Sequence, residues 1–550
     1  MRIERHQVDG ARVAQAGEDF VNRIGRQVHS YARADLMTTT EWQLIADSYL
    51  DYLGALSTTR PALDTPEAKA VLKDATEAAV GAVSFAAYYP HDGFHVFLDY
   101  PNFGMSYRRE EGLERDPRHR VSAAEWLDAF CLAIVSDKVS PHGEAFCWAR
   151  QLMPDEPLTP ALELVDGFAA HFFEEFDVPA GTQPGLRALR ALTDGDREAF
   201  DAALLALLQD GPHGRGPAGL LPLVPIALAA LAYRTYGWLP AVDTDYLPHA
   251  LVTGFETPEP RVRGLGRDRR ADAVARLAAG PVDLDRPSPA RPLSPDSEAR
   301  FERRTLEALT PKDGQPLDAW ELTSALRYQS WLLSARASQS ADATDAQLAN
   351  LRLGSRLGAA AFRAALAAPG TEAEVTVDGR TLRFPACRDR DFGPVFWETA
   401  LSYALITGDP EDLEPLLLAG PTIAAEDRTP FAPYRTALHD HLRGADPLPD
   451  TERALKEAER TRDQGYLPPP VVLFSQLVEG DETSFNLALL DALEAHRDHH
   501  SVADRATDTD APLNLGILAL ACHARRSRGW AVHVRSPYLP PRLLAAAGRA

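Results

Sequence analysis

The sequence predicts a mainly α-helical protein made of two tandem, diverged helical units of bundle-like or solenoid-like architecture, each with a small β insertion. Three observations predict this fold class. Ala, Leu, Arg and Glu are abundant while Ile and Met are scarce, helix-capping motifs precede apolar residues at helical spacing, and the two halves of the chain match each other. The chain has 550 residues, too many for one typical domain, and its 45% of hydrophobic residues suffices for a sizeable core.

Helices are expected where a capping motif stands ahead of an apolar face. Thr38-x-x-Glu41 and Ser122-x-x-Glu125 are capping boxes, and Thr65-Pro66 supplies an N-cap followed by a proline in the first turn. Gly195-Asp196 and Gly480-Asp481 each predict a helix that ends at glycine, followed by a helix that aspartate caps. Short junctions of this kind join antiparallel helices.

The two halves share residues in the same order. Gly195-Asp196 and Gly480-Asp481 are each followed at equal spacing by a phenylalanine and an Ala-Leu-Leu run. Upstream the spacing between matched residues changes, as loop insertions would cause. The sequence therefore predicts that residues from about 300 to 546 superpose on those from about 12 to 254. The pairs at one constant offset are Ala227/Ala519, Gly237/Gly529, Trp238/Trp530 and Tyr246/Tyr538, and the upstream pairs are Gly81/Gly358, Phe85/Phe362 and Trp126/Trp397.

Strands are expected in one place in each half. Residues 95–100 form a short run of β-formers, and residues 374–384 contain two such runs around Asp378-Gly379, a hairpin signal. Both lie between matched helices. The resulting division is a first helical unit at 1–254, a Pro-rich linker at 255–298 with one short helix near 271–279, and a second unit at 299–550.

Charge and cysteine content limit the class of partner. The formal net charge is −22, which disfavours binding to nucleic acid or to an anionic membrane. Such acidity serves either solubility or an acidic face for a basic partner, and the sequence leaves both open. The four cysteines form no C-x-x-C pair, no apolar leader follows Met1, and the apolar stretch 220–233 is too short to span a bilayer. We expect a cytoplasmic protein.

Candidate catalytic and metal-binding groups were sought and none is predicted. The histidines of the segment 496–500 lack a metal-ligand spacing and are expected to point into solvent from a loop. Cys131 and Cys522 lie in apolar helices and are expected to be buried thiols. The arginines of 261–270 are expected to belong to a solvated linker, although they could also contact phosphates or an acidic face. No catalytic residue, cofactor or metal is therefore predicted.

Aromatic residues concentrate in a turn-rich segment from Tyr88 to Tyr107. Aromatic side chains on loops can anchor a protein interface, or they can fill the space between a β insertion and its helices, and both remain open. If the segment binds a partner, the candidate contact residues are Tyr89, His91, Phe94, Tyr100, Asn102 and Phe103.

The chain resembles the actinobacterial immunity 49 family. The resemblance lies in residues 1–6, in 95–105 (His-Val-Phe-Leu-Asp-Tyr-Pro-Asn-Phe-Gly-Met) and in 125–133, and it returns in 513–522 and 536–540. It implies a mostly α-helical immunity protein of a bacterial polymorphic toxin system, which binds and neutralises a cognate protein toxin by stoichiometric occlusion. No functional residues of the family are carried over. The alternatives are a helical-repeat scaffold or regulatory protein with an unrelated protein partner, and an enzyme whose site one sequence does not reveal.

Overall fold

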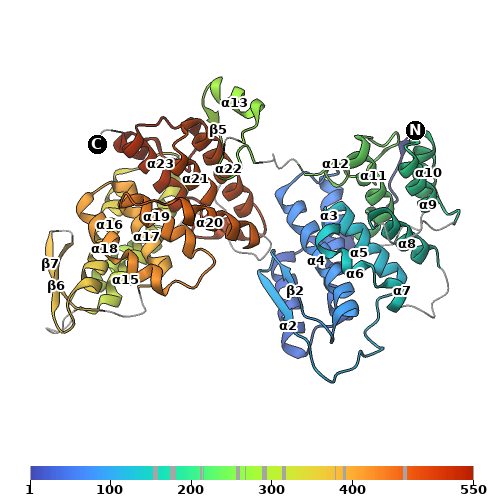
Figure 1. Cartoon of the computed structure of the whole chain (residues 1–550), viewed down its shortest axis with the longest axis horizontal. Coiled ribbons are helices and arrows are strands. Elements are labelled where there is room, and N and C mark those ends of the chain that lie inside the picture. Colours follow the sequence, from blue (N-terminus) through green and yellow to red (C-terminus); the bar gives the residue numbers. More distant parts are fainter. Residues whose placement is uncertain are drawn as a thin grey trace. The chain divides into compact units, whose positions relative to one another are not determined.

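The chain forms two compact units, Met1–Thr257 (unit 1) and Pro258–Ala550 (unit 2), each described here by itself. In the computed structural model of Figure 1 unit 1 runs from blue to green and unit 2 from green to red. The structure describes residues 2–152, 159–173, 181–210, 214, 216–255, 260–266, 268–287, 294–311, 317–377, 379–387, 392–461 and 468–548. The prediction of a mainly α-helical chain with small β insertions is confirmed.

Unit 1 is a set of helices with two small sheets. α3 packs along α4, and α5 lies between α4 and α11. β1 pairs in parallel with β4, and β2 pairs antiparallel with β3. The elements are β1 (Arg2–Ile3), α1 (Gly10–Gly17), α2 (Phe20–Ala34), α3 (Thr39–Thr59), α4 (Pro66–Tyr88), β2 (Phe94–Leu98), β3 (Phe103–Tyr107), α5 (Ala123–Val135), α6 (Val139–Phe146), α7 (Ala149–Leu152), α8 (Pro160–Phe172), α9 (Pro184–Asp194), α10 (Arg197–Asp210), the 3-10 helix η1 (Pro217–Leu220), α11 (Leu223–Tyr236), β4 (Asp243–Thr244) and α12 (His249–Thr253).

Unit 2 has the same kinds of element in the same general order. α15, α16 and α17 pack in succession, and α23 packs on α17. β5 pairs in parallel with β8, and β6 pairs antiparallel with β7. The elements are α13 (Ala271–Ala278), β5 (Val282–Asp283), α14 (Pro295–Ala308), α15 (Ala319–Gln339), α16 (Asp345–Leu366), β6 (Glu372–Val377), β7 (Arg380–Pro385), α17 (Pro394–Thr407), α18 (Pro410–Glu426), α19 (Ala432–Leu442), α20 (Leu448–Thr461), α21 (Val471–Glu479), α22 (Glu482–His500), the 3-10 helix η3 (Arg505–Thr507), α23 (Leu515–Arg528), β8 (Val534–Arg535) and α24 (Pro541–Ala547).

The helix ends follow the capping signals in the sequence. Thr38 with Glu41 and Ser122 with Glu125 form capping boxes at the starts of α3 and α5. Gly195 and Gly480 end α9 and α21 in the left-handed conformation, with φ of 70° and 82°, which glycine adopts without the steric cost of a Cβ. Local sequence thus sets where these helices begin and end.

One described stretch, Pro217–Tyr236, is long and apolar enough by composition to cross a membrane. It comprises η1 and α11, and seven consecutive residues of α11, Ile226–Ala232, are buried in unit 1. Its apolar character is accounted for by the core that it fills.

An arginine caps the same helix end in both units. In unit 1 Arg234 donates from Nη2 to the carbonyl oxygen of Val135, at the end of α5, at 2.7 Å. In unit 2 Arg526 donates from Nη2 to the carbonyl oxygen of Ile406, near the end of α17, at 3.0 Å. A cation at the carboxyl end of a helix satisfies free carbonyls and complements the helix dipole. The predicted duplication requires such matches, and it stays a prediction from the sequence.

The segment 255–298, predicted to be a linker, is largely part of unit 2. Val262, Leu277 and Leu284 are buried in the core of that unit, and β5 pairs with β8. Only the short helix was placed correctly, as α13. Proline-rich composition signals an extended backbone, but it does not tell whether that backbone is solvated or packed.

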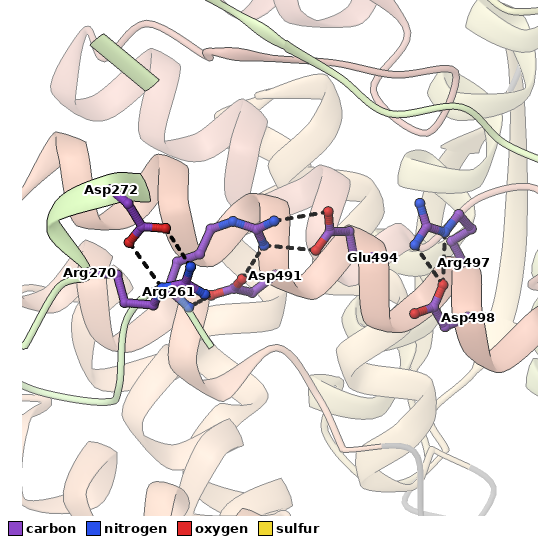
Figure 2. A network of polar contacts seen from close by, with 7 residues as sticks. All are labelled: Arg261, Arg270, Asp272, Asp491, Glu494, Arg497 and Asp498. Carbon is purple, nitrogen blue, oxygen red and sulfur yellow. Dashed lines mark hydrogen bonds and ion pairs between the residues drawn. The ribbon is translucent and has the colours of Figure 1, made fainter. Parts of the chain in front are cut away.

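The arginines of this segment bind acidic residues of unit 2. Arg261 donates from Nη1 to Asp491 at 2.5 Å and to Glu494 at 2.7 Å, both on α22, and its backbone N–H also reaches Asp491 at 2.7 Å. Figure 2 shows this clamp between two further ion pairs, Arg270–Asp272 and Arg497–Asp498. The expectation of a solvated basic run was wrong for Arg261, which binds two partly buried carboxylates, as the alternative of contact with an acidic face allowed.

The expectation for the histidine segment was also wrong. His496 and His500 are buried within α22, with ring centroids 4.5 Å apart, and only His499 of the three is partly exposed. Burial lowers the pKa of His496 to about 3. The residues 496–500 are not a loop, because α22 extends to His500 and buries the side of the helix that carries His496 and His500. Cys131 and Cys522 are buried as predicted, and burial raises the pKa of Cys522 to about 12.

Candidate interaction site

The β2–β3 hairpin of unit 1 lies against α4, where the aromatic segment was predicted. A Cβ added to Gly81 of α4 would stand 3.1 Å from Cγ2 of Val96 and 3.4 Å from the ring of Trp42. The missing side chain therefore lets β2 approach the helix closely. In the view of Figure 1, β2 lies beside α4 at the edge of unit 1.

A buried carboxylate fixes the turn between the two strands. Asp74 of α4 is fully buried, and its oxygens accept the backbone N–H groups of Asp99 at 2.9 Å and Tyr100 at 2.8 Å. The hydroxyl of Tyr49 lies 3.1 Å from the same carboxylate. Burial raises the pKa of Asp74 to about 7, and the two backbone hydrogen bonds act in the opposite direction. Asp74 thus connects the turn to the helices.

The inner face of the hairpin is filled with aromatic side chains. Phe94 stacks on Tyr107 with ring centroids 4.3 Å apart. The hydroxyl of Tyr107 accepts from Nε1 of Trp42 at 2.7 Å and donates to the carbonyl of Met37 at 2.6 Å. Because the hydroxyl of Tyr107 and the indole N–H of Trp42 both have partners, these side chains serve the packing of the hairpin on its helices.

The six predicted contact residues separate into three groups. Tyr89 and Tyr100 are buried, and their hydroxyls donate to Glu110 at 2.9 Å and Glu67 at 2.7 Å. Phe94 and Phe103 are partly buried, the latter with its ring against His29. His91 and Asn102 are exposed at the two ends of the hairpin. The structure brings all six onto one hairpin and its flanking turns, and only the last four remain accessible.

The outer face carries a patch that the sequence reasoning missed. His95 pairs with Ser106 and Phe97 with Gly104, and the rings of His95 and Phe97 lie over Gly104, where a Cβ would stand 3.1 and 3.3 Å from them. His95, Gly104 and Ser106 are exposed and Phe97 is partly exposed. Strict alternation along residues 94–98 is the signal that could have assigned Phe97 to the face opposite Val96.

The corresponding hairpin of unit 2 presents different chemistry. The outward residues of β6 and β7 are all exposed and mostly charged or hydroxylated, and Arg383 pairs with Glu374 at 2.6 Å. Across the two strands of this hairpin, Glu374 lies opposite Arg383 and Thr376 lies opposite Thr381. An aromatic ring over a glycine is thus found on the hairpin of unit 1, and none is found on the described residues of the hairpin of unit 2, 372–377 and 379–385.

Within the described ranges, no group of three or more His, Cys, Asp or Glu side chains is placed to hold a metal ion. In unit 1, burial raises the pKa of Asp74 to about 7 and that of Asp128 to about 6, whereas the hydrogen bond from Arg118 lowers the pKa of the exposed Asp116. These shifts belong to structural hydrogen bonds and packing.

The sequence model of one protein family, described as Immunity protein 49, matches residues 63–251 and 339–543. The first range contains the β2–β3 hairpin and Asp74, and the second contains the β6–β7 hairpin. No curated protein and no solved structure matches the chain.

Proposed function

Since the chain belongs to the immunity protein 49 family, whose model matches well over half of its length, we propose that it is an immunity protein that binds a cognate bacterial toxin and neutralises it by stoichiometric occlusion. Family membership is the observation that carries the proposal. The toxin is a protein, and the encounter takes place in the cytoplasm.

The charge of the chain supports a basic partner. With a net charge of −22, most of the surface has a negative potential, which accelerates association with a basic protein and selects against acidic ones. Occlusion needs only complementary shape and charge, and no turnover.

The hairpin of unit 1 is the contact region that we propose. Phe97 offers an aromatic anchor over the exposed backbone at Gly104, with His95 beside it. His91 and Asn102 are exposed at the two ends of the hairpin and could extend this contact, whereas Phe94 and Phe103 lie on the opposite, inner face and are only partly accessible, and Tyr89 and Tyr100 are buried. Interfaces derive most of their affinity from a few such aromatic anchors.

The test is co-expression of the full chain with the C-terminal domain encoded by the adjacent open reading frame, scored by cell survival and by co-purification. We expect survival only when the chain is present. Phe97→Ala should weaken binding by about thirtyfold, the effect of losing a typical hot spot of about 2 kcal/mol. Thr376→Ala, on the outer face of the other hairpin, is the matched control and should bind normally.

Two outcomes separate the parts of the proposal. Equal survival with and without the chain would reject the immunity role and favour a scaffold. Rescue that Phe97→Ala leaves unchanged would retain the immunity role and move the contact away from the hairpin.

A further inference from the structure

The junction between α21 and α22 in unit 2 binds a basic segment of its own chain. This junction consists of Glu479, Gly480 and Asp481. Arg269 donates from Nη1 to Oδ2 of Asp481 at 3.1 Å, and the backbone N–H of Gly266 donates to Glu479 at 3.1 Å. Asp481 also caps α22, so capping does not prevent it from binding an arginine. Two carboxylates on either side of a glycine thus receive an arginine-bearing turn.

The corresponding junction of unit 1 has the same pattern of charge. Asp194, Gly195 and Asp196 join α9 to α10, and Gly195 ends α9 in the left-handed conformation. Asp196 accepts the backbone N–H of Ala199 at 3.0 Å, so it caps its helix as Asp481 does. Both aspartates are exposed. Unit 1 therefore presents two carboxylates to solvent at the place where unit 2 binds an arginine.

Two aromatic rings accompany this junction in unit 1. A Cβ added to Gly195 would stand 3.7 Å from the hydroxyl of Tyr236, whose ring stacks on that of Trp238 with centroids 4.4 Å apart. Tyr236 is 44% exposed, and Leu239, which follows Trp238, is 50% exposed. Arg528 holds the position of Tyr236 in unit 2, directly before the glycine that ends the helix. Unit 1 thus has an aromatic face, which attracts cations, where unit 2 has a cation.

A contact between the start of one helix and the loop after another fixes this arrangement in both units. In unit 1 Arg197 donates from Nη2 to the carbonyl of Leu239 at 3.3 Å, and in unit 2 Glu482 accepts the N–H of Ala531 at 2.7 Å. Arg197 also pairs with Asp201 at 3.7 Å. Its charge is therefore partly compensated and leaves the carboxylates of the junction attractive to a cation.

The chain around this junction is described throughout. The residues that the structure does not describe nearby in sequence, 174–180, 211–213 and 215, adjoin α9 and α10 at the ends opposite the junction. α10 has 14 residues and, at about 1.5 Å per residue, is about 21 Å long. The exposed aspartates and Tyr236 thus lie at the described end of this helix pair.

We propose that this junction of unit 1 binds an arginine-bearing turn of a basic partner protein. An arginine of the partner stacks on Tyr236 while its guanidinium donates to the two carboxylates. The net charge of −22 favours the approach of such a partner. The proposal does not rest on the immunity role, and it concerns other elements than the β2–β3 hairpin. The residues of this junction surface are Asp194, Asp196, Tyr236, Trp238 and Leu239.

The test uses the basic segment of unit 2 as a probe. A fluorescent peptide of residues 260–270, Pro-Arg-Val-Arg-Gly-Leu-Gly-Arg-Asp-Arg-Arg, blocked at both ends, is titrated with the full chain at physiological ionic strength. We expect saturable binding of one peptide per chain, because the chain's own segment occupies the junction of unit 2. The same peptide with every arginine replaced by glutamine should not bind.

Two variants address the junction itself. Asp194→Asn combined with Asp196→Asn should weaken binding about fivefold, and Tyr236→Ala should do the same. Asparagine can still cap α10. Glu111→Gln combined with Glu114→Gln removes two exposed carboxylates elsewhere in unit 1 and should bind as the unmodified chain does. Because this control has the same net charge as the aspartate variant, a difference between them reports on the junction and not on general attraction.

The outcomes are distinct from those of the immunity test. Weaker binding by both junction variants, with the control unchanged, would support the proposal. If Tyr236→Ala fails to fold, the aspartate variant decides. The absence of saturable binding at millimolar peptide, or equal binding by the aspartate variant and the control, would overturn it. Either of these results would leave the immunity role standing, since that role is tested by co-expression and survival.

Discussion

Nε2 of His439 donates to the carbonyl oxygen of Leu417 at 2.9 Å, and this carbonyl is the one that Pro421 leaves without a helical partner. Proline inside a helix removes the N–H that would bond four residues back. Arg363 plays the same part at the other internal proline, Pro415, by donating from Nη2 to the carbonyl of Glu411 at 2.6 Å. Side chains from α19 and α16 thus allow α18 to continue through both prolines.

Gly420 is required by this arrangement. A Cβ there would stand 2.2 Å from Cδ2 of the His439 ring, so Gly420→Ala should destabilise unit 2 by about 1–3 kcal/mol through overpacking. Gly25→Ala in α2, where nothing lies within 4 Å, is the control and should be neutral or stabilise by up to about 1 kcal/mol. Urea denaturation measures both. A Gly420→Ala chain as stable as the Gly25→Ala chain would refute the role given to this glycine.

Buried histidines should make unit 2 sensitive to acid. Burial lowers the pKa of His496 to about 3 and of His523 to about 4, below the ordinary value near 6.5. The folded state favours the neutral rings, so their contribution is complete above pH 6.5 and is lost as pH falls towards 4. In that pH range, each histidine lowers the free energy of unfolding by up to about 1.4 kcal/mol for every pH unit.

Urea midpoints measured between pH 7.5 and 4.5 test this expectation. His523→Leu removes one titrating ring and should flatten the pH dependence of the transition of unit 2. The raised pKa values of Asp74 and Asp128 have the opposite sign, since their protonation favours the folded state of unit 1 as pH falls below 7. If His523→Leu leaves the change of the urea midpoint with pH as it was, His523 is not one of the groups that make unit 2 sensitive to acid.

Asp74 should control the order of the hairpin. Asp74→Leu leaves the N–H groups of Asp99 and Tyr100 without their acceptor, at a cost of about 1–3 kcal/mol each. Amide hydrogen exchange of these two residues should accelerate, while α4 stays protected. Asp74→Asn retains one acceptor oxygen and should show a smaller change. If Asp74→Leu leaves exchange at both amides unchanged, the turn is held by other contacts.

Arg261 should hold the segment 260–287 on unit 2. Arg261→Ala leaves the carboxylates of Asp491 and Glu494 without this partner in a mostly buried site, and we expect a loss of about 2–4 kcal/mol. Arg270→Ala, at an exposed pair with Asp272, should cost less than about 1 kcal/mol. Limited proteolysis should cut the segment faster in the first variant alone. Equal protection in both variants would show that the apolar contacts suffice.

Most of the fold could be predicted because its signals are local. The boxes at Thr38 and Ser122 and the glycines at 195 and 480 specify helix ends through contacts within a few residues. The packing of Val262, Leu277 and Leu284 against helices more than a hundred residues away has no such signal. For that reason the proline-rich segment was misread as a linker.

The candidate site was only partly predictable for a related reason. The density of aromatic residues predicted the hairpin, but it did not show which rings face outward. Tyr100 is buried and hydrogen-bonds to Glu67, and strand alternation places Phe97 on the outer face, where it is partly exposed. The cavity of about 220 Å³ beside Arg5 could not be predicted from the sequence at all. Its lining comes from the residues after β1 and from α1, α3 and η1, and only the fold brings these segments together.

The parallel pairing of β1 with β4 brings the first strand of unit 1 beside its last strand, and in unit 2 the strand that follows α13, β5, pairs in the same way with the last strand, β8. When the first and last strands of a unit pair, the chain enters and leaves that unit in the same region of its surface. Another unit can then be appended at that point without threading through the first. The same strand pairing makes unit 1 suited to circular permutation. In the permuted chain, Arg2 would be joined to a residue just after α12, and new ends would be opened in a surface loop.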